Sequence, residues 1–240
     1  MLKRGRPIKN DTDKSKHSML RKRWRSWLPH LKDDLSDLLG SREIFWELQD
    51  IAKENQNILN PGAFFDWMCR YYIVSIAVGA RRFTDQHHKS RSLWRMLYQI
   101  LENPGVINRS AHITLYTGVS KEMNMGNLTF DNVVGEDKKY LMQNQIRADL
   151  RKIEDANERV RKFVNKKIAH HASPKSIRRL PTFNELDFGL DTIDKILCKY
   201  TLLLTAVSPD SMHATRQDPW TEVLKEAWVK PGSKFYPDIY

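Results

Sequence analysis

The sequence predicts an all-α protein built as an up-and-down helical bundle. Apolar residues recur at three- and four-residue intervals over several long stretches, which is the pattern of amphipathic helices. No stretch shows the apolar–polar alternation that marks a half-buried strand. We expect four long core helices at about 63–83, 92–101, 136–172 and 184–206, with short flanking helices. The 240 residues, 40% hydrophobic and 29% charged, suffice to bury such a core.

The first helix of the bundle is predicted to begin near Ser41, because a serine that follows Gly40 is a favoured N-cap. The helix at 63–83 is apolar around so much of its circumference that we expect it to be central and buried. Its most apolar part, residues 71–80, is too short for a membrane span, which needs about 20 residues. One apolar stripe of this helix consists of Phe64, Trp67, Met68, Tyr71, Val74 and Val78.

The later helices have equally clear caps and faces. Ser90 or Ser92 is the expected N-cap of the helix at 92–101, and residues 103–135 are expected to form a long irregular excursion, partly helical. The inner face of 136–172 is predicted to carry Leu150, Ile153, Val160, Val164, Ile168 and His171. That of 184–206 is predicted to carry Leu186, Leu190, Ile193, Leu197, Tyr200 and Leu204. A short C-terminal helix is expected to hold Val223, Leu224 and Trp228 against the domain.

The sequence lacks the signatures of several classes of protein. Cys69 and Cys198 lie far apart without metal-ligand spacing, which predicts reduced thiols in a cytoplasmic protein. The charged N-terminus shows no apolar core of a signal peptide. P-loop, dinucleotide-binding, kinase and metalloprotease signatures are absent. His87-His88, next to Asp85, would point about 100° apart on a helix, which favours a pair in solvent over a metal site. We therefore expect no membrane span, no metal and no cofactor.

The positive charge is concentrated in two segments. The chain carries a net charge of +11, but residues 1–25 hold ten Lys and Arg against two Asp and Glu. Residues 151–179 hold ten against three, so the rest of the chain is slightly acidic. Concentrated basic segments are suited to a polyanion, although charge runs are also common on solvated surfaces. We expect residues 1–35 to form a basic, largely flexible arm and residues 36–240 to form the helical bundle.

The arm contains the stretch Lys3-Arg4-Gly5-Arg6-Pro7, which resembles an AT-hook. A narrow A·T minor groove has a strongly negative potential that attracts arginine, so Arg4 and Arg6 are candidate DNA-binding residues. A generic basic tail is the alternative reading of the same residues. Trp24 and Trp27, just beyond, are expected to pack onto the domain.

The segment from Arg159 to His171 is the strongest candidate for a catalytic site. A His near neutral pKa beside cations is suited to taking the ribose 2′-hydroxyl proton or to protonating the leaving oxygen of a phosphodiester. Nearby cations stabilise the charge of the transition state. By helical angle His171 shares the core-facing side of Val164, whereas His170 points about 100° away and is the better candidate. On spacing alone, a purely structural role for either His remains the alternative.

The run Asn165-Lys166-Lys167-Ile168-Ala169-His170 resembles the late-helix motif of HEPN domains, and the surrounding pattern resembles their abortive-infection branch (Abi U-type). That pattern comprises Arg82-Phe83-Thr84-Asp85, then Ser90-Arg91-Ser92-Leu93, and Thr182-Phe183-Asn184-Glu185-Leu186. The resemblance spans about residues 40–230. It implies a HEPN-like helical bundle that forms a homodimer, and many such domains are metal-independent ribonucleases.

The resemblance carries the motif His onto His170 and the polar residue onto Asn165, but Val164 stands where the motif has Arg. Arg161 is the nearest substitute on the same helix. We expect His170, Asn165 and Arg161 to be the catalytic group, with Lys162, Lys166, Lys167 and His171 binding the RNA backbone.

Two functions remain open at this point. One is a metal-independent endoribonuclease of phage defence or toxin type. The other is a non-catalytic HEPN module that binds nucleic acid or a partner protein, such as a nucleotidyltransferase.

Overall fold

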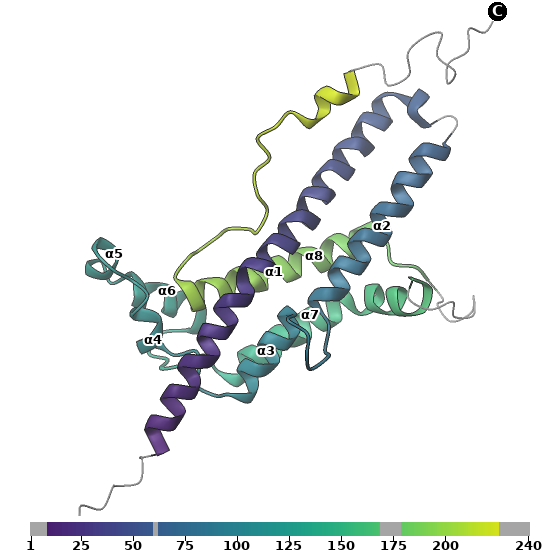
Figure 1. Ribbon diagram of the computed structural model, residues 1–240. Helices are drawn as coiled ribbons and strands as arrows, with labels where there is room; N and C mark the ends of the chain where they lie inside the picture. The colour runs from purple at the N-terminus through teal and green to yellow at the C-terminus, as the bar shows by residue number, and fades with distance from the viewer. Residues whose placement is uncertain (1–8, 60–61, 169–178, 226–240) are drawn as a thin grey trace, which may run out of the picture.

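The computed structural model describes residues 9–59, 62–168 and 179–225, and within these ranges the protein is a packed bundle of helices without a β-strand (Figure 1). The predicted all-α class is therefore confirmed. Within the same ranges, no helix combines the length and the apolar character that crossing a membrane requires. The elements are α1 (Lys9–Glu54), η1 (Gln56–Leu59), α2 (Ala63–Phe83), α3 (Leu93–Glu102), α4 (Arg109–Ile113), α5 (Val119–Glu122), α6 (Met125–Val134), α7 (Gln143–Phe163), the π-helical turn η2 (Val164–Ile168), α8 (Phe183–Thr205) and η4 (Trp220–Lys225).

Helix α1 runs the whole length of the molecule and belongs to the core from Trp24 onward (Figure 1). The expected flexible arm at 1–35 is therefore wrong for residues 9–35, and Ser41 does not cap a helix but lies inside one. Arg4 and Arg6 lie outside the described residues. Eight Lys and Arg residues lower the mean hydropathy of residues 9–35, yet the apolar residues there keep helical spacing. The buried residues of α1 are Trp24, Trp27, Leu28, Leu31, Leu35, Leu39, Phe45 and Ala52.

Helix α2 packs on α1, α7 and α8, but not with the stripe that its sequence suggested. The face buried is the one with small residues, around Ala77, Gly79 and Ala80. A Cβ at position 79 would lie 2.5 Å from Leu38 Cδ2, so this face lets α1 approach more closely than a side chain would permit. The expected stripe residues Phe64, Trp67, Tyr71 and Val74 are exposed, and Met68 and Val78 are half-buried.

Helices α7 and α8 pack against each other with the inner faces that the sequence predicted. Every residue expected on the inner face of α8 is buried, and so are Leu150, Ile153, Val160 and Val164 of α7 and η2. The side chain of Ser92 accepts a hydrogen bond from the N–H of Arg95, which makes it the N-cap of α3. Thr182 caps α8 and forms a reciprocal capping box with Glu185.

Residues 103–135, expected to be largely irregular, fold into α4, α5 and α6 and close one end of the core (Figure 1). Phe130 and Val134 of α6 are buried there. His112 is also buried, and its ring nitrogens contact the carbonyl oxygen of Leu203 at 3.2 Å and Thr129 Oγ1 at 3.0 Å. The contact to Leu203 attaches the excursion to the end of α8, and the contact to Thr129 joins α4 to α6.

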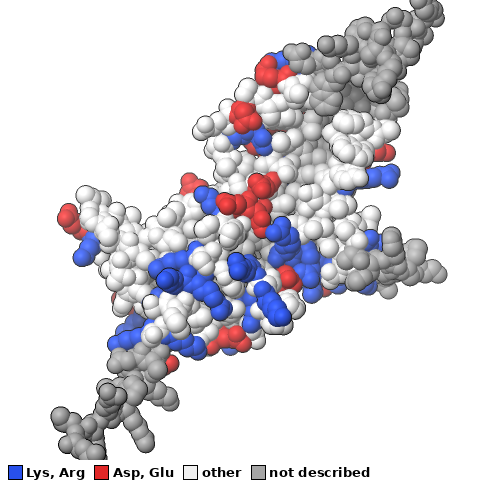
Figure 2. All heavy atoms as spheres, viewed as in Figure 1, with Lys and Arg blue, Asp and Glu red and all other residues white. Residues whose placement is uncertain are grey.

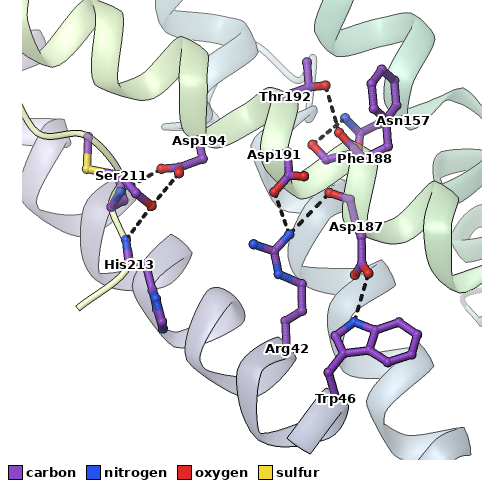
Figure 3. Close-up of polar contacts among 12 residues, drawn as sticks. Arg42, Trp46, Asn157, Asp187, Phe188, Asp191, Thr192, Asp194, Ser211 and His213 are labelled. Atoms are coloured by element: carbon purple, nitrogen blue, oxygen red, sulfur yellow. Dashed lines mark hydrogen bonds and ion pairs between the residues drawn. The ribbon is translucent and has the colours of Figure 1, made fainter. Parts of the chain in front are cut away.

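Polar contacts fasten α1 and the C-terminal segment to one side of α8 (Figure 3). Arg42 donates to Asp191 Oδ1 at 2.6 Å, and the Trp46 indole N–H donates to Asp187 Oδ2 at 2.9 Å. Asp194, on the same side of α8, accepts from Ser211 Oγ at 2.6 Å. The chain then returns along α1 to η4, where the side chains of Val223 and Leu224 are 53% and 38% exposed, and Trp228 lies outside the described residues.

Candidate nucleic-acid interface

The predicted motif lies where α7 changes from an α-helical to a π-helical turn. Val164, the position expected to carry an arginine, is buried against the core, whereas Asn165 and Lys166 next to it are exposed. Single π-helical turns inside α-helices occur frequently at functional sites. The turn also breaks the 100° increment from which the directions of His170 and His171 were predicted. Both histidines lie outside the described residues.

An arginine does reach Asn165, but it comes from α2 rather than α7. Arg81 Nε donates a hydrogen bond to Asn165 Oδ1 at 3.3 Å, and Arg81 Nη1 forms an ion pair with Asp85 Oδ1 at 3.3 Å. The Arg81 side chain is 28% exposed. The structure thus joins the end of α2 to the motif turn through one guanidinium group.

Asp85 holds Arg81 in place as an ionised partner. Partial burial of the carboxyl opposes ionisation, but a hydrogen bond from the His87 N–H and the Arg81 guanidinium outweigh it, so the pKa of Asp85 is lowered. A carboxylate that stays charged keeps the guanidinium oriented. Arg82, which the sequence motif paired with Asp85, instead forms an ion pair with Asp34 of α1 at 2.9 Å.

The other predicted site residues lie beside this group without joining it. Arg161 is half-buried one turn earlier on α7, and no ion pair of Arg161 is found among the described residues. Lys162 is exposed and forms an ion pair with Glu158 at 2.6 Å. Lys167 is half-buried. Arg161 and the lysines therefore supply positive charge near Asn165, while the contact to Asn165 belongs to Arg81.

A cavity of about 430 Å³ opens next to the Arg81–Asp85 pair, between α1 and the loop that joins α2 to α3. Its lining residues include Asp85, Arg82 and Arg91. A second cavity of about 330 Å³ shares Ser90 and Arg91 with the first and extends along α1 past Arg23 and Lys89. We call these two adjoining cavities together the loop groove.

Lysines and arginines gather around the loop groove. Figure 2 shows them over the lower half of this face, where the N-terminal half of α1, α3 and the lower end of α2 lie. The upper part of the same face, formed by the far ends of α1 and α2, is mostly uncharged. A groove edged by cations and adjoining an Arg–Asn pair is suited to a phosphodiester backbone.

Among the described residues, no group of three or more His, Cys, Asp or Glu side chains is placed to hold a metal ion. His87 and His88 are exposed in the α2–α3 loop with ring centroids 4.4 Å apart, as a pair in solvent.

Sequence reasoning missed Arg81 because its partner Asn165 is 84 residues away along the chain. The available signal was local: Arg81 and Asp85 stand at i and i+4 on a helix end, a spacing that brings side chains together.

Comparisons with known proteins add no relative: no family model matches the chain, and neither a curated protein nor a solved structure does.

Proposed function

We propose that this protein is a HEPN-like, RNA-directed effector of bacterial phage-defence or toxin type that cleaves RNA without a metal ion. The observation that supports this most is the contact between Arg81 and Asn165. It provides a guanidinium beside the motif amide, which Val164 cannot provide from α7. The resemblance of residues 165–170 to the HEPN motif supplies the expectation of ribonuclease chemistry.

The hydrogen bonds that Arg81 and Asn165 already make leave N–H groups on both side chains that can donate to a phosphate. The Asn165 amide oxygen accepts from Arg81, so both N–H bonds of the Asn165 amide nitrogen remain for a ligand. Arg81 uses Nε toward Asn165 and Nη1 toward Asp85. Its Nη2 group can therefore donate to a phosphate oxygen without breaking either contact.

In the proposed reaction His170 accepts the proton of the ribose 2′-hydroxyl, and the 2′-oxygen attacks the adjacent phosphorus. The bond from phosphorus to the 5′-oxygen breaks, and that oxygen takes a proton from a water molecule, which leaves a 2′,3′-cyclic phosphate and a 5′-hydroxyl end. The protonated His170 then returns its proton to the resulting hydroxide. Arg81 and Asn165 hold the non-bridging oxygens, whose negative charge grows in the transition state. Arg161, Lys166 and Lys167 attract the backbone.

The test is cleavage of single-stranded and structured RNA by the purified chain in EDTA. We expect Arg81→Gln and His170→Ala each to lower the cleavage rate by about 100-fold or more, because lost oxyanion donors and general bases have effects of that order. Arg147→Gln is the control, since Arg147 is an exposed arginine near the start of α7, at the opposite end of that helix from the motif turn. Equal rates for wild type and Arg81→Gln, or no cleavage by wild type, contradict the proposal.

A second function is favoured by the burial of Val164. A core residue at the motif position suits a non-catalytic HEPN-like module that binds nucleic acid or a partner protein, a nucleotidyltransferase among the candidates. Such a module binds RNA with a log affinity that falls linearly with log salt concentration, and it yields no cyclic phosphate. Deleting residues 1–8, which contain Arg4 and Arg6, tests whether the terminal basic residues contribute to that slope.

A further inference from the structure

Helices α7 and α8 enclose a cavity of about 630 Å³ between them. Its lining includes the apolar side chains of Ile196, which is buried, and Ala156, which is half-buried. Phe188 also lines it, with a side chain that is 62% exposed. Small-molecule sites in proteins are concave, largely apolar and about 300–1,000 Å³ in volume, so this cavity has the size of such a site. We call it the α7–α8 groove.

Two contacts show that α7 and α8 run antiparallel along this groove. Lys199 Nζ donates to Asp149 Oδ2 at 2.6 Å, and a Cβ at Gly189 would lie 2.6 Å from Asn157 Oδ1. Residue numbers therefore rise along α7 as they fall along α8. Because both helices advance by about 1.5 Å per residue, these two contacts fix which intermediate positions face each other.

The groove has a cationic end. In this register Lys152 of α7 faces Lys195 of α8, and both residues line the cavity. Both are exposed, and neither forms an ion pair within the part of the chain that the structure describes. Asp149 at the same end is already neutralised by Lys199, and it also accepts from the Tyr200 hydroxyl at 3.0 Å. The ammonium groups of the two facing lysines therefore remain available to an anion in the groove.

The other end of the groove is apolar. Phe188 precedes Lys195 on α8 by two helical turns, about 10 Å at 1.5 Å per residue. Thr192 stands between them, and its hydroxyl donates to the carbonyl oxygen of Phe188 at 2.8 Å, so it needs no partner from a ligand (Figure 3). Asp155, which is exposed, lies one turn from Lys152 toward this end of the groove. An anionic group is therefore favoured at the lysine end and disfavoured at the Phe188 end.

We infer that the α7–α8 groove binds a small organic anion with an apolar ring system, of the class of aromatic carboxylates and sulfonates. The rings lie against Phe188 and Ile196, and the acid group lies between Lys152 and Lys195. Aromatic rings pack on one another with centroids about 4.5–7 Å apart, and an exposed phenyl ring offers a free face for this contact. The lysines then fix the direction in which the ligand enters.

This groove is separate from the candidate nucleic-acid interface. Lys152 precedes Asn165 by thirteen residues, which is about 20 Å along α7. The described residues that line the α7–α8 groove are also different from those that line the loop groove. The inference therefore stands independently of the proposed ribonuclease activity.

Fluorescence titration of the full chain with the dye anilinonaphthalene sulfonate tests the inference, and N-phenylnaphthylamine provides the same rings without the acid group. We expect one saturable site per chain for the sulfonate. Phe188→Ser should raise the Kd of both dyes about tenfold, because both lose the ring on which they pack. Lys152→Gln/Lys195→Gln should raise the Kd of the sulfonate about tenfold and leave that of the uncharged dye within about twofold.

The controls place an exposed aromatic residue and two exposed lysines outside the groove. Trp67→Ser removes an aromatic side chain that is 52% exposed on α2, and Lys138→Gln/Lys139→Gln removes two charges before the start of α7. Both controls should bind either dye as the wild type does. The inference is overturned if the wild type shows no saturable site, or if Phe188→Ser leaves the Kd unchanged. It is also overturned if the groove lysine variant weakens both dyes equally, because the lysines then do not bind the acid group.

Discussion

A close contact between α7 and α8 at Gly189 makes Gly189→Ala an informative substitution. A Cβ at position 189 would lie 2.6 Å from Asn157 Oδ1 and 3.2 Å from Asn157 Cγ. Asn157 is buried, and its amide nitrogen donates to the carbonyl oxygen of Ile153 at 3.1 Å. The amide therefore cannot turn away from a new methyl group without losing that hydrogen bond.

The expected change in the free energy of unfolding is the sum of two destabilising effects and one stabilising effect. Overpacking a buried contact costs about 1–3 kcal/mol, and a weakened hydrogen bond of Asn157 costs about 1 kcal/mol. Replacing glycine by alanine inside a helix returns about 1 kcal/mol. We expect Gly189→Ala to lower the free energy of unfolding by about 1–3 kcal/mol. In a protein that already carries Asn157→Ala the clash is absent. There Gly189→Ala should raise the free energy of unfolding by up to about 1 kcal/mol.

The coupling between positions 157 and 189 is measured by urea unfolding, followed by far-UV circular dichroism. The four proteins compared are the wild type, Gly189→Ala, Asn157→Ala and the double variant. Gly40→Ala is the control, because a Cβ at that helical glycine meets only the end of a flexible side chain, Arg216 Nη2 at 3.3 Å. The control should be neutral or stabilising by up to about 1 kcal/mol. If Gly189→Ala has the same effect with and without Asn157, the close approach of the two helices is not what makes glycine necessary.

Three further predictions concern the core. Trp24→Ala should lower the free energy of unfolding by about 3–5 kcal/mol in a urea titration, because Trp24 is fully buried and its indole N–H donates to Gln99 Oε1. A loss below about 1 kcal/mol would mean that this part of α1 does not belong to the core. Burial lowers the pKa of His112, so the unfolded chain binds its proton more readily and stability falls as the pH drops below about 6.5, by at most ~1.4 kcal/mol per pH unit. His112→Leu should flatten that pH profile in thermal melts at about pH 7.5 and 5.5. Asp149→Ala should lower the free energy of unfolding by about 3–5 kcal/mol, because it leaves Lys199 and the Tyr200 hydroxyl without their buried acceptor. Tyr200→Phe should lower it by only about 1 kcal/mol in the same urea assay.

The fold was predictable where one face of a helix is apolar and the other is charged. Helix α7 is such a case: its charged residues leave a single apolar face, and that face is the one buried. Helix α1 was missed over residues 9–35 because its cations lower the average hydropathy, although Trp24, Leu31 and Leu35 already stand at helical spacing. Average composition hides a periodicity that packing still uses.

The candidate site was predictable only in part, for a related reason. The motif around Asn165 could be found by its resemblance, and the neighbouring positive charge could be counted. The arginine that contacts Asn165 could not, because Arg81 reaches it across the bundle from another helix. Neither residue's local sequence specifies which side chains of α2 meet the end of α7.

The sequence by itself determined that the chain is helical, where α3 and α8 lie, and which residues of α7 and α8 face inward, since the spacing of apolar residues is a local property. The predicted start of α7 at 136 was too early, because the helix begins at Gln143. Tertiary structure alone decided which face of α2 is buried. That helix is apolar on nearly all sides, and close packing selected the face where Gly79 lets α1 approach, which left Trp67 and Tyr71 outside. The Arg81–Asn165 contact follows from that choice, because rotating α2 would move Arg81 away from Asn165.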